Sequence, residues 1–135
     1  MVELNEQERN QMCFACGRHN PIGLKLQFRE EQDTYITTFT AGPEHQGYDG
    51  IVHGGIVSTL LDEVTARYIY SKGHNAVTAR LDVRFKKPTP IGEPLTITGT
   101  ITGQRGNMVE LMGTLALADG TITAQAKATV AVLED

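Results

Sequence analysis

The sequence predicts an α+β protein in which an antiparallel sheet of about six strands wraps around one long central helix. The prediction rests on a change of hydrophobic period. Apolar and polar residues alternate before residue 42 and after residue 76, whereas between these segments apolar residues recur at helical spacing. The order is two strands, one helix and four strands, so only the helix can cover the apolar face of the sheet.

The first two strands precede the helix. Residues 20–23 (NPIG) read as a turn, and apolar residues then alternate with polar ones over residues 24–29. Residues 34–40 (TYITTFT) are rich in β-branched and aromatic side chains, which is typical of the hairpin partner. Residues 1–12 are expected to form a short helix or a loose arm.

The helix is predicted from Gly55 to about Lys72, with Gly73 as its stop. At 1.5 Å per residue it is about 27 Å long. One face carries apolar side chains: Ile56, Val57, Leu60, Leu61, Val64 and Tyr68. The opposite side is small and polar: Ser58, Asp62, Thr65 and Ala66. This second side needs another neighbour, so we expect at least a homodimer and possibly a dimer of dimers.

Four strands are predicted after the helix. They are residues 77–86, 95–102, 109–117 and 121–132. The strands mostly alternate apolar with polar residues, as in a sheet that is packed on one face. Asp119-Gly120 is a hairpin signal before the last strand, whose alanines would let a helix lie close.

Length and charge limit the class of protein. With 135 residues the chain is expected to form a single domain, 1–135. The net charge of −4 predicts no nucleic-acid partner, and no basic amphipathic segment indicates a membrane surface. The polar N-terminus is unlike a secretory signal, so we expect a cytoplasmic protein that acts on a small molecule or on another protein.

The two cysteines lie in an N-terminal arm, residues 1–20. Cys13 and Cys16 have a C-x-x-C spacing, which is half of a zinc site or a redox pair. The sequence has no second such pair. Two small buried thiols that hold this arm are the favoured interpretation, with a metal or redox role as the alternative.

The chemistry is expected where the helix begins. The segment DGIVHGGIVSTLLDEV opens the helix with His53, Gly54 and Gly55, and a helix start presents unpaired N–H groups and a positive dipole end. Such amides stabilise an oxyanion, while a carboxylate acts as nucleophile or as base for a water. Asp62, eight residues after Gly54 and away from the apolar stripe, is the candidate. This apparatus suits thioester or ester hydrolysis.

Glu63 is the reserve candidate for the carboxylate. It is four residues before Arg67, a spacing that favours an ion pair on the helix surface.

Three segments together resemble a known family. HQGYDGIVHGGIVSTLLDEV, CFACGRHNPIGLKLQF before it and TARLDVRFKKPTPIGE after it look like the hotdog-fold thioesterase superfamily. The similar branch contains small acyl-CoA thioesterases related to the phenylacetate-pathway and thioesterase-superfamily-member proteins. The resemblance covers about residues 13 to 133.

The resemblance implies a role for each matched residue. Asp62 would be the nucleophile or general base, and Gly54 and Gly55 would supply the amide that polarises the carbonyl. His53 is similar to the histidine that orients the acyl end. Thr78 matches a hydroxyl that positions water across the dimer interface.

The chain departs from the family pattern at one position. Some relatives carry an asparagine six residues before the histidine, where this chain has Gly47. The neighbouring Gln46 is the candidate for the missing amide.

Coenzyme A, the other end of the substrate, needs cations for its phosphates. The candidates are Arg80, Arg84, Lys86, Lys87 and Arg105, on one polar strand face or in a turn. A solvated sheet face is the alternative.

The resulting hypothesis is an acyl-CoA thioesterase that uses no metal and no organic cofactor. A non-catalytic acyl-CoA binding protein and a hotdog hydratase or dehydratase are the alternatives.

Overall fold

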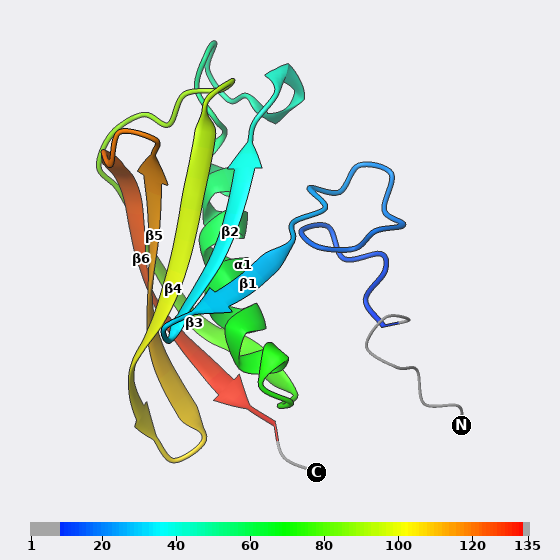
Figure 1. Ribbon diagram of the computed structural model, residues 1–135, viewed down its shortest axis with the longest axis vertical. Helices are drawn as coiled ribbons and strands as arrows, with labels where there is room; N and C mark the ends of the chain where they lie inside the picture. The colour runs from blue at the N-terminus through cyan, green and yellow to red at the C-terminus, as the bar shows by residue number, and fades with distance from the viewer. Residues whose placement is uncertain (1–8, 134–135) are drawn as a thin grey trace.

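The computed structural model describes residues 9–133, which contain six strands, one α-helix and one short 3-10 helix (Figure 1). The elements in chain order are β1 (Phe28–Glu31), β2 (Thr34–Thr40), η1 (Pro43–His45), α1 (Gly54–Ser71), β3 (Ala76–Phe85), β4 (Pro94–Arg105), β5 (Met108–Leu117) and β6 (Ile122–Val132). The predicted order of two strands, a helix and four strands is confirmed. Of the predicted N-terminal arm, residues 1–8 lie outside the described residues, and residues 9–12 form turns.

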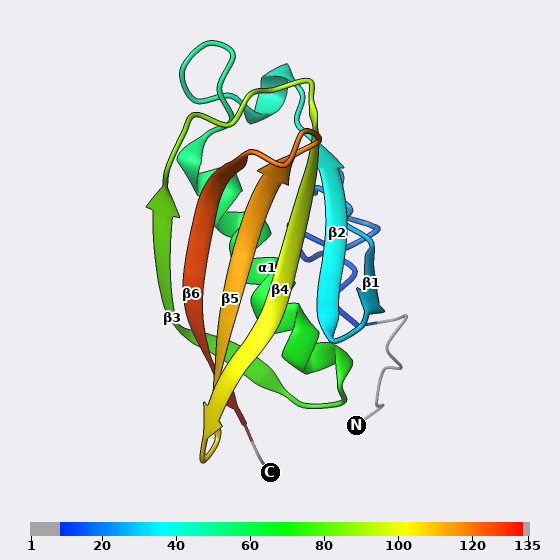
Figure 2. The same ribbon diagram turned by 60° about the vertical axis from the view of Figure 1, so that its left-hand side comes forward.

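The six strands form one antiparallel sheet in the order β1-β2-β4-β5-β6-β3. The sheet curves around α1, which lies against one face, as Figures 1 and 2 show. β1 and β3 are the two edge strands. Together these features are the predicted α+β architecture of a sheet wrapped around a central helix.

Two glycines in the sheet let α1 approach closely. A Cβ on Gly99 of β4 would lie 2.5 Å from the backbone oxygen of Val64, and one on Gly113 of β5 would lie 3.3 Å from the Leu61 side chain. The helix buries its apolar stripe at these points, with Leu60, Leu61 and Val64 fully enclosed. The helix therefore approaches the backbone of the sheet closely at this pair of facing glycines.

Thr65 departs from the predicted division of the helix into apolar and polar sides. It was expected on the polar side, but it is fully buried, and its hydroxyl donates to the Leu61 carbonyl oxygen at 2.9 Å. The bond to its own helix satisfies the hydroxyl, so the threonine can pack against the sheet as an apolar residue would.

The strand predicted at residues 24–29 begins later than expected. Leu24 and Leu26 are buried, but their backbone N–H groups donate to the carbonyl oxygens of Phe14 and Ala15 at 2.8 and 2.9 Å. The alternating segment is thus paired with the cysteine-containing arm, and only β1 joins the sheet.

The register of β3 shifts between Thr78 and Arg80, where the strand pairs with β6. Such a bulge inserts one residue and changes which side chains share a face. Before the shift Thr78 faces α1, and after it Leu81 and Val83 pack against the core. The strict alternation predicted for this strand, with Thr78 on the polar face, is wrong at this point.

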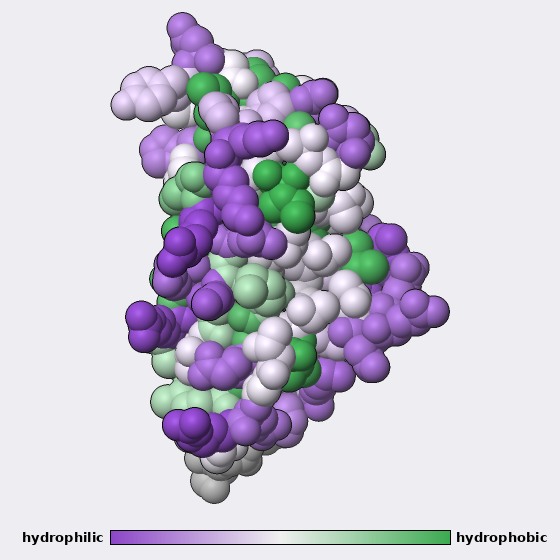
Figure 3. Space-filling view, turned by 90° about the vertical axis from the view of Figure 1, so that its left-hand side faces the viewer, coloured by the Kyte–Doolittle hydropathy of each residue, from purple (hydrophilic) through white to green (hydrophobic). Residues whose placement is uncertain are grey.

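The face of the sheet that lies opposite α1 is mixed in character. Figure 3 shows hydrophilic and neutral side chains over most of it, with separate hydrophobic ones among them. Within residues 9–133, no helix combines the length and apolar character needed to cross a membrane.

Candidate active site

The start of α1 lies at the surface, and His53 is the last residue of the loop that precedes it. His53 is the N-cap, and its Nδ1 accepts the N–H of Gly55 at 2.8 Å. A neutral imidazole that accepts at Nδ1 carries its proton on Nε2. Gly54 is the first helical residue, so its N–H has no acceptor within the helix. Of the two predicted amide donors, the histidine thus occupies that of Gly55, and Gly54 is the one that the helix leaves for a ligand.

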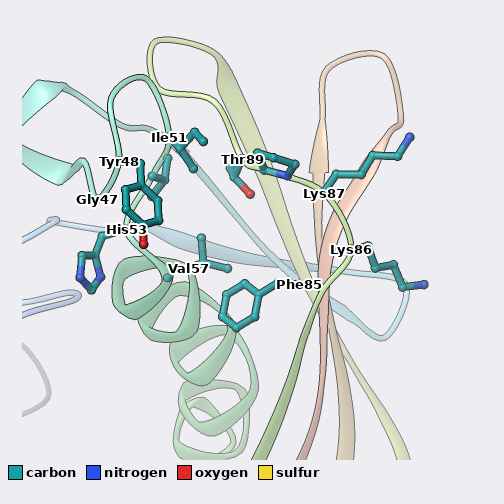
Figure 4. A pocket seen from close by; sticks show the side chains of 12 residues that line it. Gly47, Tyr48, Ile51, His53, Val57, Phe85, Lys86, Lys87 and Thr89 are labelled. Atoms are coloured by element: carbon teal, nitrogen blue, oxygen red, sulfur yellow. The ribbon is translucent and has the colours of Figure 1, made fainter.

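A cleft of about 680 Å³ opens beside this helix start. Figure 4 shows residues from three segments around it: the loop before α1, the first turn of α1, and the end of β3 with the residues that follow. The ring of Phe85 lies over the helix start, 3.5 Å from where a Cβ on Gly54 would be. Phe85 and Tyr48 are 58% and 87% exposed although they are aromatic, so the mouth of the cleft is apolar.

Asp62 and Thr78 form a hydrogen-bonded pair. The Thr78 hydroxyl donates to Asp62 Oδ1 at 2.5 Å, which is within the short range of bonds to carboxylates. Both residues are half-buried, and the β3 bulge places the hydroxyl toward the helix. The resemblance implied that Thr78 acts across a dimer interface, whereas here the contact is made within one chain.

Asp62 and Gly54 are far apart along the same helix. Eight residues separate them, which corresponds to about 12 Å along the axis. Both cannot contact one carbonyl group from the same chain, because a carbonyl carbon and its oxygen are only about 1.2 Å apart.

The predicted cationic residues do not form one cluster. Lys86 and Lys87 line the cleft, and in Figure 4 their side chains extend away from Phe85. Arg80 and Arg84 are exposed on β3. Arg105 is the last residue of β4, about 36 Å along that strand from its first residue, Pro94, and its contact with a phosphate stays a prediction.

Gln46 does not fill the role suggested for it. Its side-chain nitrogen donates to the Pro43 carbonyl oxygen at 3.0 Å, and its side-chain oxygen accepts from the Gly50 N–H at 2.7 Å. It braces the loop, and the cleft is lined instead by the neighbouring Gly47. The expectation that Gln46 presents its amide to the substrate is therefore not met.

Glu63, the reserve candidate, lies in a different environment from the predicted surface pair. Burial raises the pKa of its carboxyl, which accepts a hydrogen bond from Cys16. Burial, together with the negative charge of Glu63, raises the pKa of the Cys16 thiol to about 12. The positive charge of Arg67 acts in the opposite direction and lowers the pKa of both groups. Glu63 thus belongs with the cysteines of the arm rather than on an open helix surface.

Sequence reasoning missed one aromatic residue at the cleft. Phe85 was assigned to the apolar, core-facing side of its strand, but it is exposed at the cleft. Tyr68, by contrast, was expected on the apolar face of the helix, and there it is buried and stacks on Tyr35 with ring centroids 4.9 Å apart. The signal for Phe85 was its position directly before the lysine pair that leaves the sheet.

Comparison with known proteins identifies the family. Residues 49–127, more than half of the chain, match the model of the thioesterase superfamily. The chain belongs to this superfamily. The matched range includes the helix start, Asp62 and Thr78.

One curated relative is the acyl-coenzyme A thioesterase THEM4 of Bos taurus. It is 27% identical over 113 residues, which are 81% of this chain and 46% of the relative. The same protein of Mus musculus is 39% identical over 56 residues, 42% of this chain and 24% of the relative. The chain therefore spans less than half of the length of these relatives.

Solved structures show the same fold. A thioesterase superfamily protein of known crystal structure is 30% identical, with a TM-score of 0.80. The match covers 85% of this chain and 60% of the other protein's chain. The PaaI protein of E. coli, from the phenylacetic acid degradation operon, is 19% identical with a TM-score of 0.76, over 82% of this chain and 81% of that one.

A hypothetical thioesterase from Streptococcus pneumoniae has been solved in several forms. They include one complex with coenzyme A and two alanine mutants, one of an aspartate and one of a threonine sixteen residues later. The coenzyme A form is 22% identical, with a TM-score of 0.75, over 82% of this chain and 87% of that one. These similarities show the hotdog fold.

Proposed function

We propose that this chain hydrolyses acyl-coenzyme A thioesters, with Asp62 as the nucleophile or general base. The observation that carries the proposal is the short Thr78–Asp62 hydrogen bond, which orients a half-buried carboxylate on the helix of a thioesterase-superfamily fold. The aspartate and threonine mutated in the Streptococcus pneumoniae protein have the same sixteen-residue separation as Asp62 and Thr78. The named activity of the curated relatives supports the same reaction.

The reaction follows from the groups at the site. The carboxylate attacks the thioester carbonyl carbon, or it takes a proton from the water that attacks. The Gly54 N–H at the positive end of α1 stabilises the oxyanion that develops. The carbon–sulfur bond then breaks, and coenzyme A leaves as a thiolate that takes up the proton given up by the water. Where the carboxylate is the nucleophile, that water hydrolyses the acyl anhydride formed on Asp62. Both routes therefore convert acyl-CoA and one water to a free acid and coenzyme A. A carboxylate and amide dipoles suffice, so the proposed reaction uses no metal and no organic cofactor.

The site is proposed to form between two chains. Because Asp62 and Gly54 are about 12 Å apart along one helix, the carboxylate of one protomer would act on a carbonyl held at the helix start of its partner. The edge strand β3 supports this homodimer. It has an unpaired backbone edge, and Val77 on it is 49% exposed although it is apolar. A dimer of dimers is the larger assembly we consider.

The coenzyme A phosphates are proposed to lie at the lysines of the cleft. Lys86 and Lys87 follow Phe85 at the mouth, where an acyl or pantetheine chain would contact the exposed ring. Arg80 and Arg84 are exposed on the same edge strand and are the second choice. We expect the protein to act in the cytoplasm.

The test is release of free thiol from a panel of acyl-CoAs. Wild type should release thiol, and Asp62→Asn should lose about 10²- to 10⁴-fold in kcat/KM, the usual contribution of an acid–base group. Asp82→Asn, an exposed aspartate on β3, is the matched control and should behave as wild type. An Asp62→Asn protein with full activity would exclude Asp62 as the catalyst.

The same panel distinguishes a non-catalytic binding protein. Such a protein would show a higher melting temperature with intact acyl-CoA and no thiol release. A hydratase would change the acyl chain and leave the thioester intact.

A further inference from the structure

Three side chains that the proposed hydrolysis does not use lie close together, and one of them follows Asp62 in the chain. The sulfur atoms of Cys13 and Cys16 and a carboxylate oxygen of Glu63 all lie within 4.8 Å of one another. The cysteines come from the arm before β1, and Glu63 comes from α1, next in the chain to Asp62. All three are half-buried, and neither cysteine is in a disulfide.

The backbone of the arm fixes the two thiols on one side. The Cys16 N–H donates to Cys13 Sγ at 3.5 Å, and the Gly17 N–H donates to the Cys13 carbonyl oxygen at 2.9 Å. A Cβ on Gly17 would lie 2.3 Å from the backbone oxygen of Gln11, so only glycine fits at this turn. The C-x-x-C-G segment is therefore a tight turn in which the Cys16 N–H faces Cys13 Sγ.

The arm itself is held to the rest of the fold. The backbone N–H groups of Leu24 and Leu26 donate to the carbonyl oxygens of Phe14 and Ala15, the two residues between the cysteines. Ala15 is 3% exposed and belongs to the core. The thiols thus reach Glu63 from a fixed backbone rather than from a loose end.

The donor set has the chemistry of a zinc site. Thiolates select soft or borderline metals such as Zn²⁺ over Mg²⁺ and Ca²⁺. In a tetrahedral site Zn–S is about 2.3 Å and Zn–O about 2.0–2.2 Å, so neighbouring donor atoms are about 3.5–3.8 Å apart. The three donors need to move together by about 1 Å from their 4.8 Å limit, within the reach of side-chain rotation.

We propose that Cys13, Cys16 and Glu63 bind one Zn²⁺ ion that fastens the N-terminal arm to α1 beside Asp62. The charges of two thiolates and one carboxylate are balanced by those of Zn²⁺ and the neighbouring Arg67 guanidinium. Binding forms two Zn–S bonds and one Zn–O bond and releases the two thiol protons to solvent. Water would occupy the fourth coordination position of the ion.

A disulfide between the cysteines explains the geometry less well. It would need an oxidant such as a peroxide to remove two electrons and two protons, and it would leave the half-buried Glu63 beside the sulfurs without a role. A metal uses all three groups. The disulfide is therefore the competing outcome of the test.

The test begins with the full chain, reduced and stripped of metal with a chelator. Co²⁺ is then added as a spectroscopic probe, followed by Zn²⁺. We expect one Co²⁺ per chain with thiolate-to-cobalt charge-transfer absorption, which Zn²⁺ then displaces. Cys13→Ser should keep about half of that absorption per bound ion, since one of the two thiolates remains. Glu63→Gln should keep the absorption and bind more weakly.

Two controls separate this site from the proposed hydrolysis. Asp62→Asn and Glu44→Gln, the second at an exposed carboxylate, should bind Co²⁺ as wild type does. Zn²⁺ should raise the melting temperature of the wild type and not of a Cys13→Ser, Cys16→Ser double variant.

The proposal is overturned if reduced wild type shows no thiolate-to-cobalt absorption. It is also overturned if the double variant binds Co²⁺ as tightly as wild type, or if the chain forms an internal disulfide, two hydrogens lighter, and binds no metal once reduced. The wild-type spectrum decides the question even where a cysteine variant does not fold. Thioesterase activity is measured separately, so its loss or presence does not change this result.

Discussion

Replacing Thr78 by valine tests whether the hydroxyl positions the Asp62 carboxylate. Valine has nearly the same shape as threonine, so the change removes the hydrogen bond and leaves the packing of β3 in place. A bond to a charged group contributes about 1.5–3 kcal/mol, and the 2.5 Å separation here is typical of such bonds. If this energy is expressed in the transition state, kcat/KM should fall roughly 10- to 150-fold.

The assay is release of coenzyme A thiol by wild type, Thr78→Val, Asp62→Asn and the double variant. Thr78→Ser should recover most of the activity, and Thr96→Val, on the exposed side of β4, should have none of the effect. Because residues that act as a unit are not additive, Thr78→Val should add nothing in the Asp62→Asn background. Equal activity of Thr78→Val and wild type, or an equal loss in both backgrounds, would refute the reasoning.

Further predictions concern stability and the helix start. Gly99→Ala places a Cβ 2.5 Å from the Val64 backbone oxygen. A denaturant titration should show a free energy of unfolding that is lower by about 1–3 kcal/mol. Gly103→Ala, which has open space around the added Cβ, is the control and should not lower it. Tyr68→Phe removes the 2.6 Å hydrogen bond that lowers the pKa of Glu30. Because the folded-state pKa of Glu30 lies below its unfolded value, this bond stabilises the protein at neutral pH. The difference in melting temperature between the variant and wild type should therefore shrink as the pH falls through the folded-state pKa of Glu30. A gap that widens in acid would contradict this sign. His53→Ala should cost about 0.5–2 kcal/mol as a lost N-cap. His53→Asn should restore stability, and activity that stays low in it would show that the imidazole also acts on the substrate.

The elements themselves could be predicted from the sequence, because each has a local signal. α1 combines a 3.6-residue period with a glycine entry, and β2 was predicted with the bounds that the structure has. The carboxylate was found for a similar reason: a polar side chain facing away from the apolar stripe of a central helix is costly unless it has a partner. These signals lie within a few residues of one another.

The features that could not be predicted depend on contacts between distant segments. Alternation places Thr78 with the polar residues of β3, and only the bulge against β6 turns it toward Asp62. Leu24 has a strand pattern, but its backbone partner is the arm. In each case the segment with which the backbone pairs decides where the side chain lies, and the register of that pairing cannot be read from a single sequence.

The distance between the two halves of the site along α1 has a consequence for how the protein behaves in dilute solution. If each catalytic centre draws on two protomers, dissociation abolishes turnover without unfolding either chain. Below the dissociation constant the specific activity should then fall with dilution, and a cell could set it through expression level alone. Mixing Asp62→Asn with a chain that is defective only at the helix start would create about one working centre in each mixed pair, which makes subunit exchange measurable through rate.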